Sequence, residues 1–237
     1  MTNVLLNNID HHDLRVITRH GAEFGDGINQ VMVFPTEFES AGREYPIVFR
    51  KDRDGALRPA ALLGLDRDEN LFLDGAGGWQ ARYVPALRQR GPFSIAAPEN
   101  ADGEPMIRID PDHPRVSRSE GAPLFLQHGG NSPYLEHVTE VLRTIYIGHH
   151  QVEPMLAAFD AAALLRPVKL EMRVSESELF AVSDVLTIDE ERLAALDGAA
   201  LEALHRAGFL RAAFLAAASL ANVGGLIERK NRQRAAA

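Results

Sequence analysis

Histidines and a carboxylate near the N-terminus form the first group of residues that could carry chemistry. His11, His12 and Asp13 lie together, and a His and an Asp two residues apart can supply two ligands of a 2-His-1-carboxylate iron site. A distant histidine, His149 or His150, would complete that site. We favour a simpler interpretation, in which Asp13 caps or pairs locally and the adjacent His149 and His150 point apart at a helix end. The expected protein therefore carries no metal cofactor.

Aromatic and cationic residues form the second group, within the stretch WQARYVPALRQR. If this stretch is a strand, Trp79 and Tyr83 share one face, either as a wall of the core or as an exposed amphipathic platform. We favour the core wall. Arg88 and Arg90 follow Pro85 and are harder to bury, so they are the best candidates for contacts with an anion or a partner protein.

Recognisable enzyme motifs are missing from the chain. It has no serine elbow, no Walker pattern, no HExxH and no cysteine, which excludes disulfides and thiolate metal sites. The glycines at 75–78 lack the Lys-Ser/Thr of a phosphate loop and precede an expected strand, so they indicate a turn. We expect a protein that is not an enzyme.

Charge and composition restrict the partners. The 237 residues carry a formal net charge of −8, which argues against a general nucleic-acid binder. Neither end resembles a targeting segment, and we expect a cytoplasmic protein.

Sequence patterns must then supply the elements that position these residues. The first half holds short runs rich in Val, Phe and Leu, separated by Gly, Pro, Asp and Asn, which is typical of antiparallel strands joined by turns. Hairpin turns are expected at Asp54-Gly55 and at 75–78, and a strand at 106–110. The last third is mostly helical. The pattern favours an α+β fold in a single domain, 1–237, with 97–121 as a weaker candidate boundary.

Helix signals follow from residue 134 onward. The apolar spacing predicts a helix over 134–150 and a second one that begins with Pro154 in its first turn and ends before Pro167. A strand pair at 168–174 and 179–188 follows. Thr187 with Glu190 fits a capping box, Asp197 a second N-cap, and Gly208 a helix end.

The apolar run 207–227 could be mistaken for a membrane span. Its many Ala and Gly residues add little to insertion, and Arg211, Ser219 and Asn222 oppose it. We therefore expect a packing helix and no membrane span, with four residues at helical spacing facing inward: Leu210, Phe214, Ala217 and Ala221.

Several stretches together carry a family resemblance. They include FPTEFESAGREYPIVF, ALLGLDRDENLFLDGAGGWQARYVPALRQRGPF, EGAPLF, GNSPYL and AASLANVGGLIERK. Almost from end to end, the chain resembles the bacterial SapC-like family. It departs at RQRGPF, where the family pattern has two adjacent arginines and an aromatic residue.

The resemblance implies little chemistry. Similar proteins are named for surface-layer systems, are often labelled peptide-transport permeases, and tend to occur near genes for TonB-dependent receptors and for flavin- or iron-dependent oxidising enzymes. This implies an accessory protein in uptake or modification that binds a partner protein or a small anionic ligand. The candidate surface comprises Glu37, Tyr45, Trp79, Tyr83, Arg88 and Arg90. The alternatives are an iron-dependent oxygenase-like enzyme and a surface-layer or envelope component.

Overall fold

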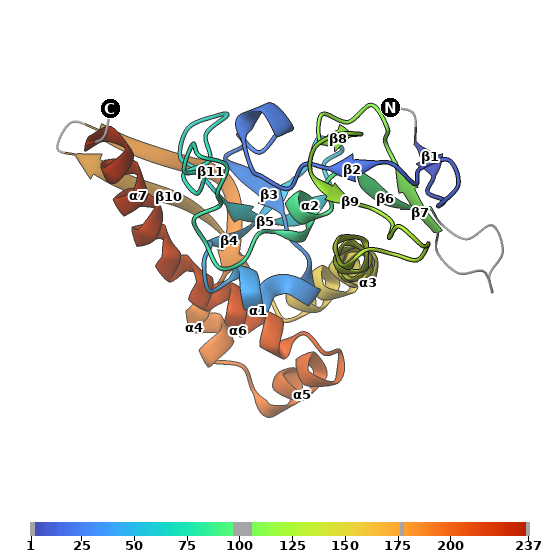
Figure 1. Cartoon of the computed structure of the whole chain (residues 1–237). Helices are drawn as coiled ribbons and strands as arrows, with labels where there is room; N and C mark the ends of the chain where they lie inside the picture. The colour runs from blue at the N-terminus through green and yellow to red at the C-terminus, as the bar shows by residue number, and fades with distance from the viewer. Residues whose placement is uncertain (1–2, 97–105, 176–177, 236–237) are drawn as a thin grey trace.

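The structure is a computed structural model that describes residues 3–96, 106–175 and 178–235 (Figure 1). Its strands are β1 (Val4–Leu5), β2 (Arg15–Val16), β3 (Gln30–Met32), β4 (Ile47–Lys51), β5 (Leu57–Leu62), β6 (Phe93–Ala96), β7 (Met106–Ile109), β8 (Val116–Ser117), β9 (Ala122–Pro123), β10 (Leu165–Ser175) and β11 (Glu178–Ile188). Its α-helices are α1 (Phe38–Ala41), α2 (Ala86–Gln89), α3 (Pro133–Ala161), α4 (Glu190–Ala194), α5 (Gly198–Arg206), α6 (Leu210–Ser219) and α7 (Val223–Ala235). Short 3₁₀ turns are η1 (Ala22–Phe24), η2 (Pro35–Glu37) and η3 (Leu220–Asn222).

Three antiparallel sheets organise the part of the chain that the structure describes. The largest has the order β10-β11-β4-β5-β3, and two small sheets have the orders β1-β7-β6 and β8-β2-β9. Helices dominate the C-terminal part, so the expected α+β class is confirmed. The candidate boundary at 97–121 falls partly on residues 97–105, which lie outside the described residues.

The β4–β5 hairpin forms at the predicted turn. The Asp52 carboxylate accepts the backbone N–H groups of Asp54 and Ala56 at 3.0 and 2.9 Å. Gly55 has φ = 81°, a left-handed conformation that glycine adopts without steric cost. This turn places the charged residues of both strand ends around one opening.

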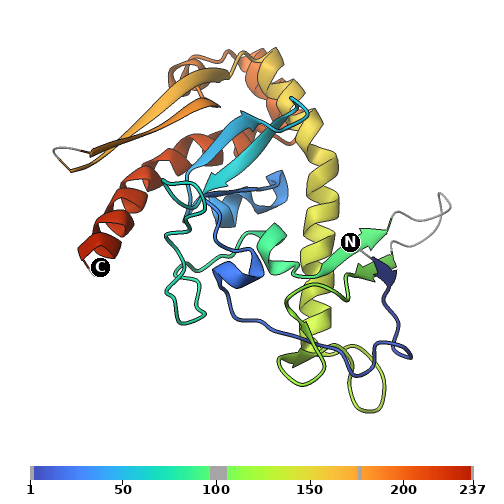
Figure 2. The same ribbon diagram turned by 90° about the horizontal axis from the view of Figure 1, so that it is seen from above.

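The β10–β11 ribbon is the longest strand pair. Each strand has 11 residues, but only Val185 and Leu186 of β11 pair with β4. The rest of the ribbon projects from the sheet, and α7 packs along β10 (Figure 2).

Helix α3 connects two hydrophobic clusters. Its N-terminal half contributes Leu135, Val138 and Leu142 to the smaller cluster, around the two small sheets. Its C-terminal half contributes Met155 and Phe159 to the larger cluster, around the five-stranded sheet. Figure 2 shows this long helix running past both parts.

Pro154 lies inside α3, so the prediction of two separate helices is wrong. An interior proline removes one helical hydrogen bond and costs about 3 kcal/mol or more. The turns around and beyond it bury Val152, Met155 and Phe159, each worth about 1.5–3 kcal/mol. Burial of these side chains outweighs the lost hydrogen bond.

Residues 79–84 do not form the expected strand. They make a series of bends with one isolated bridge, between Leu73 and Trp79. The Asp74 carboxylate accepts the N–H groups of Ala76 and Gly78, both at 2.8 Å, and curls the backbone at this point. The local turn therefore replaces strand pairing, although Trp79 still packs against the larger cluster.

The helix caps in the C-terminal part agree only partly with those predicted from the sequence. Thr187 does not cap α4; it lies in β11, and Asp189 instead accepts a backbone N–H three residues on, at 3.0 Å. Asp197 caps α5 as predicted, with a bond of 2.8 Å. Gly208 follows the end of α5 with φ = 82°.

The inward face of α6 differs from the prediction. Ala217 is buried as expected, but Phe214 is 52% exposed and Ala221 is exposed. The buried side chains of this helix are small: Ala212, Ala213, Ala216, Ala217 and Ser219. The Ser219 hydroxyl accepts the N–H of Ile47 in β4 at 2.9 Å, which turns the small-residue face toward the sheet. Leu210 is half-buried against the larger cluster.

Candidate functional site

A pocket of about 250 Å³ lies where the segment after β2, the short helix α2 and the first turns of α3 meet. Its polar lining comes from His20, Arg88, Gln89, Arg115, Tyr134 and His137. We call it the arginine pocket. Ile17 and Val84 add apolar walls.

A buried ion pair forms one wall of the arginine pocket. Arg115 and Asp26 are 4% and 1% exposed, and Arg115 Nη2 lies 2.6 Å from Asp26 Oδ2. Arg115 Nη1 donates to the carbonyl oxygens of Ile17 and Arg19, which ties the segment after β2 to the loop before β8. The guanidinium also stacks over the Phe24 ring, 4.6 Å from its centroid.

Asp26 stays ionised despite its burial. Burial opposes the charge, but the hydrogen bonds from His20 and Gly21 and the charge of Arg115 outweigh it and hold the pKa of Asp26 below its usual value. All three donors use the same oxygen, Oδ2. This one oxygen therefore joins three parts of the pocket wall.

Arg88 brings a second positive charge without a carboxylate of its own. Its Nη1 donates to the Gly25 carbonyl at 2.9 Å, while its buried Nε has no partner among the described residues. Burial lowers the pKa of Arg88, and the nearby charges of Arg90 and Arg115 add to this effect against the opposing charge of Asp26. Positive charge therefore exceeds negative charge here.

Tyr134 and His137 supply polar groups from α3. The Tyr134 hydroxyl makes no hydrogen bond with the described residues, and burial raises the pKa of this phenol to about 12. It remains a neutral donor at physiological pH. His137 Nε2 donates to Gln89 Oε1 at 3.1 Å, which positions both side chains at the opening. The pocket offers positive charge and uncommitted donors, the chemistry of a site for a carboxylate or phosphate.

Next to this pocket lies a hydrogen-bond network of aromatic residues, in which Tyr45 is buried and Trp79 and Tyr83 are half-buried. Trp79 Nε1 donates to the Tyr45 hydroxyl at 2.8 Å, and that hydroxyl donates to the Tyr83 carbonyl. The Tyr83 hydroxyl donates to Glu37 Oε2 at 2.8 Å. The edge-on contact of His20 with Trp79, 5.2 Å between ring centroids, connects the network to the arginine pocket.

Glu37 and Tyr45 belong to the interior and not to the candidate surface predicted from the sequence. They are 3% and 0% exposed. Glu37 also accepts the N–H groups of Phe34 and Ala86, at 3.2 and 3.0 Å, so it ties η2 to the start of α2. Burial raises the pKa of Glu37, because its partners are neutral donors that only partly offset the desolvation.

A family model described as SapC matches residues 6–226 of the 237-residue chain. The chain belongs to the SapC family. This confirms the resemblance seen in the sequence. No curated protein and no solved structure matches the chain.

The two arginines predicted in this SapC chain have different environments. Arg88 lines the arginine pocket, whereas Arg90 lies outside its lining and donates from Nη1 to the Phe93 carbonyl at 3.0 Å. Burial lowers the pKa of Arg90 as well. Of these two arginines, only Arg88 lines the pocket and is placed to meet a ligand there.

The residues of the alternative iron site serve local structure. Asp13 pairs with Arg118, His11 Nδ1 lies 3.2 Å from the Asn7 carbonyl oxygen, and His12 Nδ1 donates to the Ile9 carbonyl at 2.9 Å. His149 and His150 lie within α3, and the His149 ring contacts Phe34 edge-on. Across residues 3–96, 106–175 and 178–235, no group of three or more His, Asp or Glu side chains could hold a metal ion.

Most residues of the arginine pocket could not be predicted from the sequence. Asp26 and Arg115 are 89 positions apart, and neither lies in a motif that suggests a site. Tyr134 and His137 were visible only as the start of a helix. The usable signal was the cluster of arginines after Pro85, which pointed to Arg88.

Proposed function

We propose that this SapC protein is a non-catalytic accessory protein that binds a small carboxylate or phosphate in the arginine pocket. The observation that carries the proposal is the guanidinium of Arg88, which is half-buried near Arg115, has a buried Nε without a hydrogen-bond partner among the described residues, and has no carboxylate of its own. Partial desolvation of a cation that has no carboxylate partner is unfavourable, and a bound anion would supply that partner. The resemblance to accessory proteins of uptake or modification systems agrees with a binding role.

Calorimetric titration with inorganic phosphate and with benzoate, at low salt, tests this proposal. Tyr134→Phe is the sharpest variant, because its hydroxyl contributes no hydrogen bond to the described fold. We expect unchanged stability and about fivefold weaker anion binding, equivalent to one hydrogen bond of about 1 kcal/mol. Arg88→Gln should weaken binding by at least about tenfold, because it removes a charge-assisted contact.

Arg82→Ala is the matched control. Arg82 lies on the same connecting segment, is exposed and makes no hydrogen bond or ion pair with the described residues. The Arg82→Ala substitution removes one positive charge, as Arg88→Gln does, but leaves the arginine pocket intact. The Kd for the anion should therefore change less than twofold. Absence of anion binding at millimolar concentrations, or equal losses in Arg82→Ala and Arg88→Gln, would contradict the proposal.

A further inference from the structure

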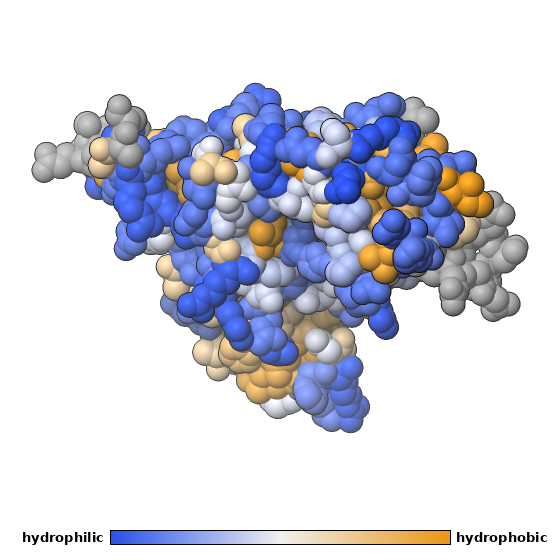
Figure 3. Space-filling view, in the orientation of Figure 1, coloured by the Kyte–Doolittle hydropathy of each residue, from blue (hydrophilic) through white to orange (hydrophobic). Residues whose placement is uncertain are grey.

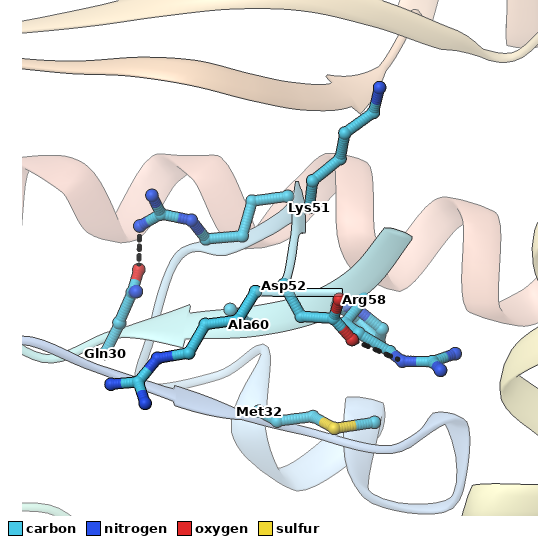
Figure 4. Close-up of a pocket in the computed structure, with 9 residues that line it drawn as sticks. Gln30, Met32, Lys51, Asp52, Arg58 and Ala60 are labelled. Carbon is cyan, nitrogen blue, oxygen red and sulfur yellow. Dashed lines mark hydrogen bonds and ion pairs between the residues drawn. The ribbon is translucent and has the colours of Figure 1, made fainter. Parts of the chain in front are cut away.

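A second basic opening lies on the five-stranded sheet, away from the arginine pocket. It encloses about 450 Å³ between the β4–β5 hairpin and β3. Four cationic side chains and one carboxylate line it: Arg50, Lys51, Arg53, Arg58 and Asp52. Figure 4 shows the Lys51 ammonium extending away from the other labelled side chains.

Strand register concentrates this charge. Arg50 of β4 pairs directly with Arg58 of β5, so two like charges lie opposite each other in the ladder. Such a cross-strand pair of like charges destabilises a sheet unless something compensates it. The two strands therefore place positive charge here at an energetic cost.

Among the described residues, Arg58 is the only one of these cations with a carboxylate partner. Arg58 pairs with Asp52 at 3.3 Å and with Glu153 of α3 at 3.4 Å. Arg50 donates to Gln30, a neutral side chain that leaves its charge uncompensated (Figure 4).

The rim carries two further free charges. Lys51 and Arg53 are exposed and make no hydrogen bond or ion pair with the described residues. Three cations that have no ion pair with the described residues thus line one opening in a chain whose net charge is −8. This is a local concentration of positive charge and not an average property of the surface.

The floor of the opening is apolar. Met32, Pro59 and Ala60 line it, and the last two are buried. A ligand that fits would carry a compact organic body on this floor and anionic oxygens toward the rim.

We propose that this opening binds a phosphorylated small molecule. A phosphate ester carries a charge of about −1.5 to −2 at neutral pH and three acceptor oxygens, which matches several cations better than a single carboxylate does. The guanidiniums of Arg50 and Arg53 provide planar forks for phosphate oxygens, and Lys51 provides a mobile charge. The site shares no residue with the arginine pocket, so it is independent of the function proposed above.

Titration of the full-length protein with pyrophosphate, followed by calorimetry and ³¹P NMR, tests this site. The double variant Lys51→Ala/Arg53→Ala removes two rim charges that hold nothing in the fold, so it should retain wild-type stability. We expect its Kd for pyrophosphate to rise by about tenfold, which corresponds to two contacts of about 0.7 kcal/mol each.

Arg67→Ala/Arg82→Ala is the matched control, because it removes two exposed arginines that lie outside the opening. The Kd of this control for pyrophosphate should change less than twofold. Equal losses in the control would show non-specific attraction, and no pyrophosphate binding at millimolar concentrations would also overturn the proposal. Tighter binding of a deca-glutamate peptide than of pyrophosphate would overturn it in favour of an acidic segment of a partner protein.

Discussion

Two buried carboxylates in this protein behave differently because their donors differ. Burial opposes the charge of Asp26, but the hydrogen bond from His20 and the guanidinium charge of Arg115 hold its pKa below the usual value. Glu37 receives only neutral donors, and burial raises its pKa. Asp26 therefore adds stability as an anion, whereas the charged form of Glu37 is disfavoured by the fold.

Replacement of Asp26 should be strongly destabilising and should alter the pH dependence of stability. Asp26→Asn leaves Arg115 buried without a counter-ion, and we expect a loss of about 3–5 kcal/mol in the free energy of unfolding. Because the folded pKa lies below the unfolded value of about 3.9, the contribution is present above that pH and is lost as pH falls through the folded pKa. Urea unfolding of both proteins between pH 7 and pH 3 measures it.

The matched control is Asp54→Asn, in the exposed turn between β4 and β5. We expect a change within about 0.5 kcal/mol, as for most surface substitutions. An Asp26→Asn variant as stable as this control at pH 7 would show that the ion pair adds nothing to the fold.

Helix α3 joins the two hydrophobic clusters, and its middle must approach η2 closely. Gly148 makes this possible: a Cβ at this position would lie 2.4 Å from Phe34 Cβ and 2.4 Å from Thr36 Oγ1. The Thr36 hydroxyl also donates to the Thr144 carbonyl of α3 at 3.0 Å. The glycine before the two histidines thus has a packing role.

Gly148→Ala should therefore destabilise the protein although alanine favours helices. We expect a cost of about 1–3 kcal/mol from overpacking, measured by thermal or urea unfolding. Gly224→Ala in α7 is the control with the opposite sign, because nothing lies within 4 Å of its added Cβ. That variant should gain up to about 1 kcal/mol from helix propensity. A stabilised Gly148→Ala variant would show that α3 does not rest on η2 here.

The C-terminal helical run determines whether the protein could insert into a membrane. Leu210–Ala235 is long and apolar enough to cross a membrane by length and composition, and only 33% of its most apolar window is buried. Figure 3 shows hydrophobic side chains gathered at the lower edge, over the helices there. Against a membrane span, Lys230 of α7 forms ion pairs with Asp66 and Glu69, at 2.7 and 2.6 Å.

We expect the protein to remain in the supernatant after ultracentrifugation without detergent. The reason is that α6 packs its small residues on the large sheet and Lys230 holds α7 to the loop after β5. Phe214→Ser, which removes an exposed aromatic side chain, should leave this partition unchanged. Protein that stays in the pellet after a high-salt wash, and is released only by detergent, would identify the run as a membrane anchor.

The amino-acid sequence by itself determined the features that depend on near neighbours. Asp54-Gly55 made a hairpin, Asp197 a helix cap and Gly208 a helix end, because their side chains or backbone conformations act within a few residues. The α+β class and the family also followed from local patterns and motifs that span the chain.

Only the tertiary structure decided where helices end and which of their faces are buried. It also decided where the arginine pocket lies. Pro154 stayed inside α3 because distant burial outweighed a local penalty, and Phe214 faced outward because Ser219 bonds to β4. The arginine pocket depends on Asp26 and Arg115, which are brought together by packing and carry no local signal. Interaction energies between residues that are far apart in the chain depend on tertiary packing. They cannot be predicted from the local sequence around either residue.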